Sequence, residues 1–314
     1  MSKLFTIDLT NNQMISDEPF LIFDSKKNIT KSGSEYYKLE IGDKTGRITA
    51  MIWEDSIPNC NETELKEGNI VNIWGKVEEY KGAKQIKILS TKPAENYKES
   101  DFISASKRNP KKMWEEFIDH VASIRDKNIK SLIKKIFEDE KIKTKFKNFP
   151  AAERIHHAYK HGLLEHVLEM LDMAEPICNF YPEADKSLVK AGIILHDIGK
   201  IIELEDNTIS YLRTIEGNLI GHLILGYELV LKYLDTDFPE FLKIKLKHII
   251  LSHHGEQEFG SPVKPMIIEA IIVSQVDNLS SKTRQYQRIL DENAQEQGEF
   301  SSRDPFLGTK VYLK

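Results

Sequence analysis

The chain has few cysteines and no long hydrophobic run. Its 314 residues include two cysteines, Cys60 and Cys178, and neither has a CxxC partner. This scarcity argues against a disulfide framework and a thiolate zinc site, and it is typical of the reducing cytoplasm. No stretch approaches the roughly 18 apolar residues that span a bilayer. The first residues also lack the apolar core of a signal peptide. We therefore expect a cytoplasmic protein that does not enter a membrane.

The composition is that of a globular protein with an uneven charge distribution. Hydrophobic residues make up 40% and charged residues 30% of a chain long enough for two domains. The net charge is −5, yet positions 107–147 hold 13 basic against 7 acidic residues, a local excess of +6. Such a segment is either a footprint for an anionic substrate or, more commonly, a solvated helix face.

The first 92 residues have the pattern of short β-strands. Apolar residues alternate with polar ones in Tyr37-Leu39-Ile41, Ile48-Ala50-Ile52, Val71-Ile73-Val77 and Ile86-Ile88, and glycine-containing turns separate these runs. About five short strands in such a length predict a small closed β-barrel, with the OB-fold as the candidate.

The residues expected on the outer face of this barrel combine rings with cations. They include Tyr36, Lys38, Trp53, Trp74, Lys76 and Lys87, together with Arg47 and Gln85. Aromatic rings stack on bases and cations follow phosphates, so this face favours binding of single-stranded nucleic acid. The alternative for each tryptophan is that it caps the barrel or packs against the second domain.

The remainder of the chain is predicted to be helical. Residues 93–109 are polar and poorly patterned, which indicates a linker, and Asn109 and Pro110 then supply an N-cap and a first helical residue. Helical spacing continues to about residue 290, with one extended insert near 209–218. We expect an all-α domain over residues 110–300 and a C-terminal tail over 301–314.

One apolar run leads directly into a His-Asp pair. Residues 193–200 read Ile-Ile-Leu-His-Asp-Ile-Gly-Lys, which predicts a buried helix that ends at Gly199. His196 and Asp197 would then be buried, which is costly unless a partner compensates them. A divalent cation is one such partner, and a hydrogen bond within the pair is the other.

Other polar residues occupy similar positions at apolar helix ends or on inward faces. Nine of the ten histidines lie between His156 and His254. The set comprises His166, His196, Asp197, His222, His253, His254 and Asp277. Burying so many imidazoles and carboxylates without a cation costs several kcal/mol, so metal binding is the economical explanation. Nitrogen and oxygen donors suit Mn, Fe, Co, Ni or Zn, and Mg where fewer histidines take part.

The order of these residues resembles the HD-domain metal-dependent phosphohydrolases. Shorter words resemble one branch, the YhaM-type 3′–5′ exoribonucleases: Phe149-Pro150-Ala151-Ala152, His156-His157-Ala158-Tyr159, Gly162-Leu163-Leu164-Glu165-His166, Gly221-His222, His253-His254-Gly255 and Gly260-Ser261-Pro262. Proteins of that branch join an N-terminal OB-fold to an HD domain, so the resemblance covers nearly the whole chain. Two positions depart from the family pattern: His161 stands where glycine is common, and Ser280 where a second acidic residue is common.

The resemblance implies roles for these residues. His166, His196, Asp197 and Asp277 would hold one divalent ion, and Asp197 would bridge to a second held by His222, His253 and His254. We expect manganese, with Co, Fe, Ni, Zn or Mg as alternatives and one or two ions per chain. Lys200 would hold a phosphate oxygen or the attacking water, unless it is a solvent-exposed cation at a helix end. His157 would meet the substrate, unless it makes a structural hydrogen bond.

The function implied is that of a metal-dependent 3′–5′ exoribonuclease. It would release nucleoside 5′-monophosphates from single-stranded RNA, with single-stranded DNA as a further substrate, and the chain would be able to form a homo-oligomer. One alternative keeps the HD chemistry but acts on a small nucleotide, as a phosphodiesterase or nucleotidase. A second alternative is a non-catalytic nucleic-acid-binding protein with a structural metal site.

Overall fold

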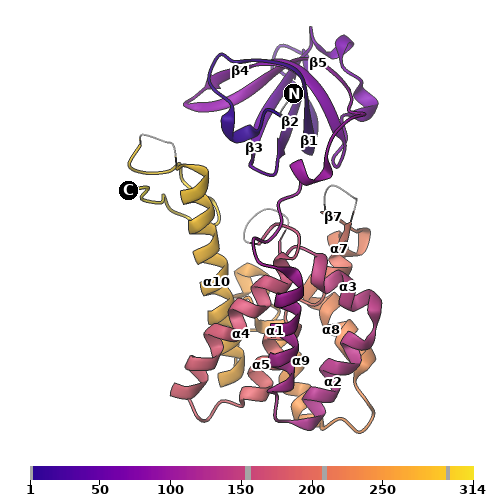
Figure 1. Ribbon diagram of the computed structural model, residues 1–314, viewed down its shortest axis with the longest axis vertical. Helices are drawn as coiled ribbons and strands as arrows, with labels where there is room; N and C mark the ends of the chain where they lie inside the picture. The colour runs from indigo at the N-terminus through magenta and orange to yellow at the C-terminus, as the bar shows by residue number, and fades with distance from the viewer. Residues whose placement is uncertain (1–2, 153–156, 207–210, 295–297) are drawn as a thin grey trace. The chain divides into compact units, whose positions relative to one another are not determined.

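The computed structural model of this protein describes residues 3–152, 157–206, 211–294 and 298–314 (Figure 1). By its internal contacts the chain divides after Ser104 into an N-terminal β unit and a C-terminal helical unit. None of the described helices is long and apolar enough to cross a membrane. The multidomain organisation predicted from the sequence, a small β-barrel followed by an all-α part, is confirmed.

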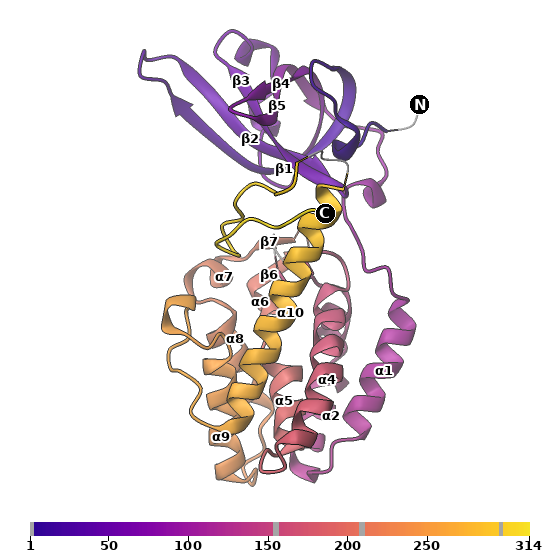
Figure 2. The ribbon, with the colours of Figure 1, turned by 90° about the vertical axis from the view of Figure 1, so that its left-hand side faces the viewer.

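Five strands form a closed barrel in the N-terminal unit (Figure 2). They are β1 (Met14–Ile29), β2 (Glu35–Asp43), β3 (Gly46–Trp53), β4 (Ile70–Tyr80) and β5 (Ala83–Pro93). Around the barrel the order is β1-β2-β3-β5-β4, in which β3 and β5 are parallel and the other neighbours antiparallel. Phe20, Ile41, Ile52, Ile73 and Ile86 are fully buried inside it. The closed barrel is therefore built on the alternation that the sequence shows.

Strand β1 escaped the sequence analysis because its alternation is broken. Its pairing with β4 shifts between Ile15 and Glu18, and its pairing with β2 shifts between Ile22 and Asp24. Each such bulge adds a residue to one strand and reverses the face to which later side chains point. A strict period of two is therefore absent from the segment, although it contributes buried residues to the barrel.

The segment 93–109, expected to be a linker, is attached at both ends. Phe102 is 3% exposed and packs in a small cluster with Leu21 and Ile70 of the barrel. Beyond the division of the units, the backbone nitrogen of Ser106 donates to the carbonyl oxygen of Lys160 at 3.0 Å. The poor patterning of this segment reflects local contacts of single residues, which leave no periodic signal.

The C-terminal unit is a helical bundle with two short strands. Its helices are α1 (Pro110–Ala122), α2 (Lys127–Glu138), α3 (Glu140–Asn148), α4 (Gly162–Phe180), α5 (Lys186–Leu195), α6 (Lys200–Glu203), α7 (Ile215–Leu219), α8 (His222–Tyr233), α9 (Glu240–Ser252) and α10 (Ile268–Glu292). The strands β6 (Leu204–Asp206) and β7 (Tyr211–Arg213) pair in the expected insert, part of which lies outside the described residues. As predicted, Asn109 caps α1, and its side chain accepts from the nitrogens of Lys111 and Lys112.

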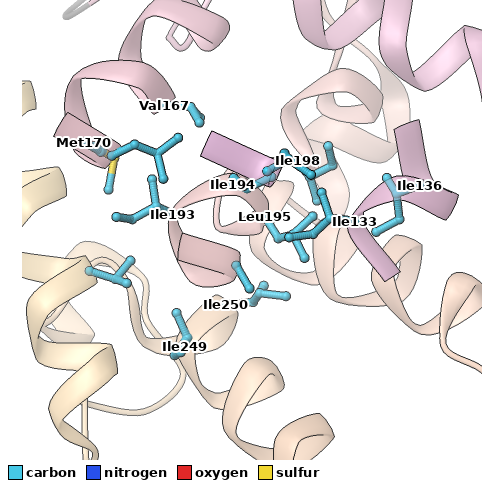
Figure 3. Close-up of a cluster of buried hydrophobic side chains, with 14 of the residues drawn as sticks. Ile133, Ile136, Val167, Met170, Ile193, Ile194, Leu195, Ile198, Ile249 and Ile250 are labelled. Atoms are coloured by element: carbon cyan, nitrogen blue, oxygen red, sulfur yellow. The ribbon is translucent and has the colours of Figure 1, made fainter. Parts of the chain in front are cut away.

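Helix α5 lies at the centre of this bundle and packs against α2, α4, α9 and α10. Figure 3 shows its Ile193, Ile194 and Leu195 among side chains of the neighbouring helices, including Ile133 and Ile249. All five residues are fully buried. Because α5 is surrounded, the residues that follow it emerge in the interior of the bundle, where several helix ends meet.

The prediction that this helix ends at Gly199 is wrong. Helix α5 ends at Leu195, a turn follows, and α6 begins at Lys200. Gly199 has a φ of −64°, so it is not a left-handed C-cap. A Cβ atom at Gly199 would lie 2.0 Å from the carbonyl oxygen of His222. The glycine is required because the start of α8 approaches the backbone here, which brings His222 close to Asp197.

The predicted tail folds back on itself. The backbone nitrogen of Ser301 donates to the oxygen of Val311 at 2.9 Å, and Phe300 pairs with Tyr312. Val311 is 2% exposed. The side-chain amide of Gln285 on α10 donates to Asp304 at 2.8 Å, which ties the tail to that helix.

Candidate metal centre and nucleic-acid interface

The seven residues expected to bind metal come from five elements and meet in one place. His166 lies on α4, His196 and Asp197 follow α5, His222 opens α8, His253 and His254 follow the last residue of α9, and Asp277 lies on α10. Three overlapping groups have ligand atoms within 4.8 Å of one another: His222, His253 and His254; His166, His196 and Asp197; and His196, His253 and Asp277. The overlap joins all seven residues into one cluster.

The spacing of the facing atoms fits shared ions better than direct hydrogen bonds. His166 Nε2 lies 3.2 Å from Asp277 Oδ1, and His196 Nε2 lies 3.3 Å from Asp197 Oδ2. Asp197 Oδ1 lies 3.5 Å from His222 Nε2 and 3.6 Å from His253 Nε2. Two ligand atoms about 2.1 Å from one ion, at tetrahedral or octahedral angles, are about 3.0–3.4 Å apart. The donor set and its spacing therefore fit divalent ions.

In each imidazole the Nδ1 atom is bound away from the cluster. His196 Nδ1 lies 2.8 Å from the oxygen of Ile193, His253 Nδ1 2.8 Å from that of Ile250, and His254 Nδ1 2.8 Å from that of Phe259. A carbonyl oxygen only accepts, so Nδ1 carries the proton in these three rings. The Nε2 lone pairs are then directed into the cluster, which is the usual arrangement of histidines that bind metal.

Burial keeps several of these rings neutral. It lowers the pKa of His166 to about 4. It also lowers the pKa of His254 to about 3, and there the neighbouring His253 and His222 contribute. For His196 burial lowers the pKa, but the charges of Asp197 and Asp277 outweigh it and the net shift is upward. Neutral imidazoles at pH 7 are the form that binds metal ions.

Both carboxylates of the cluster are held in the charged form. Burial alone would raise the pKa of Asp197, but the Lys200 ammonium and His196 outweigh it and lower that pKa well below 3.8. For Asp277 burial again acts upward, and His166 and His196 lower its pKa further than burial raises it. Charged carboxylates among neutral imidazoles give the cluster an excess of negative charge, which favours cations.

Lys200 is buried against this cluster. Its Nζ lies 2.7 Å from Asp197 Oδ2 and donates to the carbonyl oxygen of Ala151, and the residue is 8% exposed. The alternative of a solvent-exposed cation at a helix end is therefore wrong. The next turn of the same helix carries Glu203, which the sequence analysis did not single out.

Glu203 contacts His222 on the side opposite the cluster. Its carboxylate oxygens lie 3.1 and 3.2 Å from His222 Nδ1, and Oε1 also accepts from the backbone nitrogen of His222 at 3.3 Å. Its side chain is 6% exposed. A carboxylate behind a ligand histidine orients the ring and increases its basicity. The only sequence signal was an acidic residue one turn after Lys200, which is equally typical of a solvated helix.

His157 lies beside the cluster, but its side chain is closed off from solvent. The ring is 0% exposed, Nε2 lies 3.1 Å from Glu169 Oε2, and burial lowers its pKa to about 3. Its neighbour His156 lies outside the described residues. His161, the first departure from the family pattern, turns away: its Nδ1 contacts the carbonyl oxygen of Lys147 at 2.7 Å.

On the barrel, the aromatic residues expected on the outer face are half-buried. Tyr36 and Trp53 face each other across β2 and β3, with ring centroids 5.4 Å apart and planes inclined by 34°. Trp74 lies on β4, where the Lys92 ammonium is 5.5 Å from its ring centroid. The structure thus brings Tyr36 and Trp53 together as one aromatic pair, while Trp74 belongs to a different strand pair.

The three lysines of this face lie along one row of neighbouring residues. Lys38 of β2 pairs with Met51 of β3, Met51 with Lys87 of β5, and Lys87 with Lys76 of β4. Lys38 and Lys76 are exposed and Lys87 is half-buried. Lys76 and Lys87 are directly opposite each other, an arrangement of like charges that destabilises a sheet. A polyanion lying along this row would offset the repulsion.

Comparisons with known proteins match both units and the whole chain. Residues 163–282 match the HD domain family, and residues 24–94 match a family described as OB-fold nucleic acid binding domain. A protein of Bacillus velezensis named 3′-5′ exoribonuclease YhaM is 36% identical over 95% of this chain and 94% of its own length. Its Bacillus subtilis namesake is 34% identical over 95% and 94%. Its Listeria welshimeri namesake is 33% identical over 90% of both chains.

These relatives extend across the barrel, the linking segment and the helical unit alike. The resemblance first noticed in short words around the histidines is therefore matched over nearly the full length. The residues that converge in the candidate metal centre lie in the part that matches the HD domain. The chain belongs to the family of the YhaM 3′–5′ exoribonucleases.

Proposed function

We propose that this protein is a metal-dependent 3′–5′ exoribonuclease. It shortens single-stranded RNA, and also single-stranded DNA, and releases nucleoside 5′-monophosphates. The observation that carries the proposal is the convergence of imidazole Nε2 atoms on Asp197, with three of the rings anchored through Nδ1 to carbonyl oxygens. This occurs in a chain whose relatives, similar over at least 90% of its length, are named 3′-5′ exoribonucleases.

The residues of the cluster divide into two sets that share Asp197. His166, His196, Asp197 and Asp277 would hold one ion, and His222, His253 and His254 a second. Five imidazoles against two carboxylates favour Mn, Co, Fe, Ni or Zn over Mg, and manganese is our first expectation. Bound there, such ions would supply Lewis-acid stabilisation of the charge that develops on the phosphate and would acidify the attacking water.

Lys200 contributes a fixed positive charge at the edge of this centre. Its Nζ donates to Asp197 Oδ2 and to the Ala151 carbonyl oxygen, so the lysine orients the carboxylate that faces both ion sites. A phosphate oxygen approaching Asp197 would come within reach of the same ammonium group. His157 is enclosed and paired with Glu169, which favours the structural one of its two proposed roles.

The barrel would hold the strand upstream of the scissile bond. Tyr36, Trp53 and Trp74 offer rings on which bases stack, and each stacked base contributes about 1–3 kcal/mol. Lys38, Lys76 and Lys87 would follow the phosphates along their row. Neither contact reads a base sequence, so we expect sequence-tolerant binding whose affinity falls steeply with salt.

The test is direction-resolved degradation of RNA. With 5′-labelled single-stranded RNA and Mn²⁺, the purified protein should give a ladder shortening from the 3′ end and release 5′-monophosphates. EDTA should abolish the ladder, and Mn²⁺ should restore it. Cleavage of small phosphodiesters alone would instead support a nucleotide phosphodiesterase. Binding of RNA without turnover under any divalent ion would support a non-catalytic protein. A parallel assay on single-stranded DNA decides whether DNA is a substrate.

A further inference from the structure

Glu169 collects hydrogen-bond donors between α4 and α10, beside the candidate metal centre. Its Oε2 lies 3.3 Å from Ser280 Oγ and 3.1 Å from His157 Nε2, and its Oε1 pairs with the Arg284 guanidinium. A carboxylate paired with arginine is ionised and only accepts hydrogen bonds. Each of these neighbours must therefore donate to Glu169.

Ser280 connects Glu169 to one of the candidate ligands. Its Oγ lies 3.1 Å from His166 Nδ1 and 3.3 Å from Glu169 Oε2. A hydroxyl group has one proton, and Glu169 requires it. The oxygen of Ser280 then faces His166 with a lone pair, so the bond between them requires a proton on His166 Nδ1.

This arrangement determines which nitrogen of His166 is available to an ion. With the proton on Nδ1, the lone pair of the neutral ring is on Nε2, 3.2 Å from Asp277 Oδ1. His166 is fully buried, so bulk water does not exchange its hydrogen-bond partners. Unlike His196, His253 and His254, which are held by backbone carbonyls, His166 depends on side chains for its orientation.

We propose that Glu169 and Ser280 form a relay that fixes the tautomer of His166 and so directs Nε2 at the metal. Glu169 is a positioning residue: it acts through Ser280 and touches neither ion nor substrate. The inference rests on the metal-binding part of the proposed function and is independent of which phosphodiester is cleaved.

The test compares two isosteric substitutions on α4. In Glu169→Gln the amide can donate to Ser280 Oγ, which lets the hydroxyl donate to Nδ1 and moves the ring proton to Nε2. We expect Mn²⁺ affinity of the apoprotein to fall about 10- to 100-fold. We also expect the ¹⁵N spectrum of His166 to change from the Nδ1–H to the Nε2–H form. Glu165→Gln is the control, because Glu165 contacts the same Arg284, at 3.4 Å, and Tyr159 but not Ser280.

A second pair of variants tests the hydroxyl and remains informative if Glu169→Gln does not fold. Ser280→Ala should reduce Mn²⁺ affinity as Glu169→Gln does, and Ser280→Thr should keep it. The relay is overturned if Glu169→Gln keeps both the affinity and the Nδ1–H tautomer, if Glu165→Gln loses as much, or if Ser280→Ala binds as tightly as the unaltered protein. Because these readouts use no RNA, a protein inactive on RNA would refute the proposed function and leave the relay standing.

Discussion

His253 Nε2 lies 3.6 Å from Asp197 Oδ1, and neither of these buried atoms forms a hydrogen bond. A buried polar atom without a partner costs about 1–3 kcal/mol, and more when it is charged. The same oxygen of Asp197 also faces His222 Nε2 at 3.5 Å. A protein tolerates such unpaired atoms where an ion completes them, so Asp197 is the residue on which the function depends most.

The first prediction concerns that carboxylate. Asp197→Asn keeps the shape of the side chain but removes the negative charge between the two proposed ion sites. We expect RNA cleavage to fall by more than about 100-fold. Lys200 keeps its bond to the Ala151 oxygen, so the far-ultraviolet circular dichroism should stay unchanged. Asp291→Asn, at an exposed position of α10, is the matched control. An Asp197→Asn protein with full activity would refute the bridging role.

Removal of metal should lower stability as well as activity. Without ions, the charged carboxylates and unpaired nitrogens of the cluster remain buried, and each uncompensated group favours unfolding. Ions that bind only the folded state stabilise it by mass action, by about 2.7 kcal/mol at 100 times the dissociation constant. The melting temperature after chelation should therefore rise again with Mn²⁺ or Co²⁺, and less with Mg²⁺. Equal recovery with Mg²⁺ would count against the nitrogen-rich donor set.

The lysine row of the barrel should affect long substrates only. Lys76→Ala combined with Lys87→Ala should weaken RNA binding and lower the slope of log affinity against log salt by about 2, one for each lost phosphate contact. Hydrolysis of a small phosphodiester should stay unchanged. The double variant should also unfold at a slightly higher temperature, because it removes two like charges that oppose each other directly. Lys66→Ala, at an exposed position outside the strands, is the control.

A truncation gives a coarser version of the same experiment. Removing the barrel should weaken cleavage of long RNA while hydrolysis of a tiny phosphodiester persists. The cut belongs after Ser104, since Phe102 packs on barrel residues and a cut at 92 would leave it exposed. Loss of both activities to the same extent would argue against a strand-holding role for the barrel.

Acid should destabilise the apoprotein between about pH 6.5 and 4. Burial lowers the pKa of His166 to about 4, and those of His157 and His254 to about 3. Below pH 6.5 the unfolded chain takes up protons at these residues and the folded chain does not. Each such group therefore lowers the free energy of unfolding by up to about 1.4 kcal/mol per pH unit. His196, whose pKa is raised, acts in the opposite direction but is outnumbered.

The measurement is urea unfolding of the metal-free protein at a series of pH values. The free energy of unfolding should decrease steadily from pH 6.5 to pH 4. His166→Gln, which removes one of the buried imidazoles, should make that decrease shallower. A flat profile over this interval would show that these histidines are not held neutral in the folded protein.

The fold was predictable where burial imposes a period on the sequence. Alternation located four strands of the barrel, and the N-cap at Asn109 located the start of α1. Strand β1 was missed because its two bulges cancel the period. The end of α5 was misplaced because Gly199 was interpreted as a helix terminus. In the structure, that glycine answers to the backbone of His222, more than twenty residues further along the chain.

The histidines and aspartates of the site were visible in the sequence by themselves, because polar residues inside apolar helix patterns need a compensating partner. Their metal-binding character follows from residue type and pattern alone. The roles of Glu203, Glu169 and Ser280 were decided by the tertiary structure. A glutamate or serine on a helix has the same local pattern whether it faces water or the back of an imidazole, and only the packing of α4 against α10, and of α6 against α8, distinguishes the two.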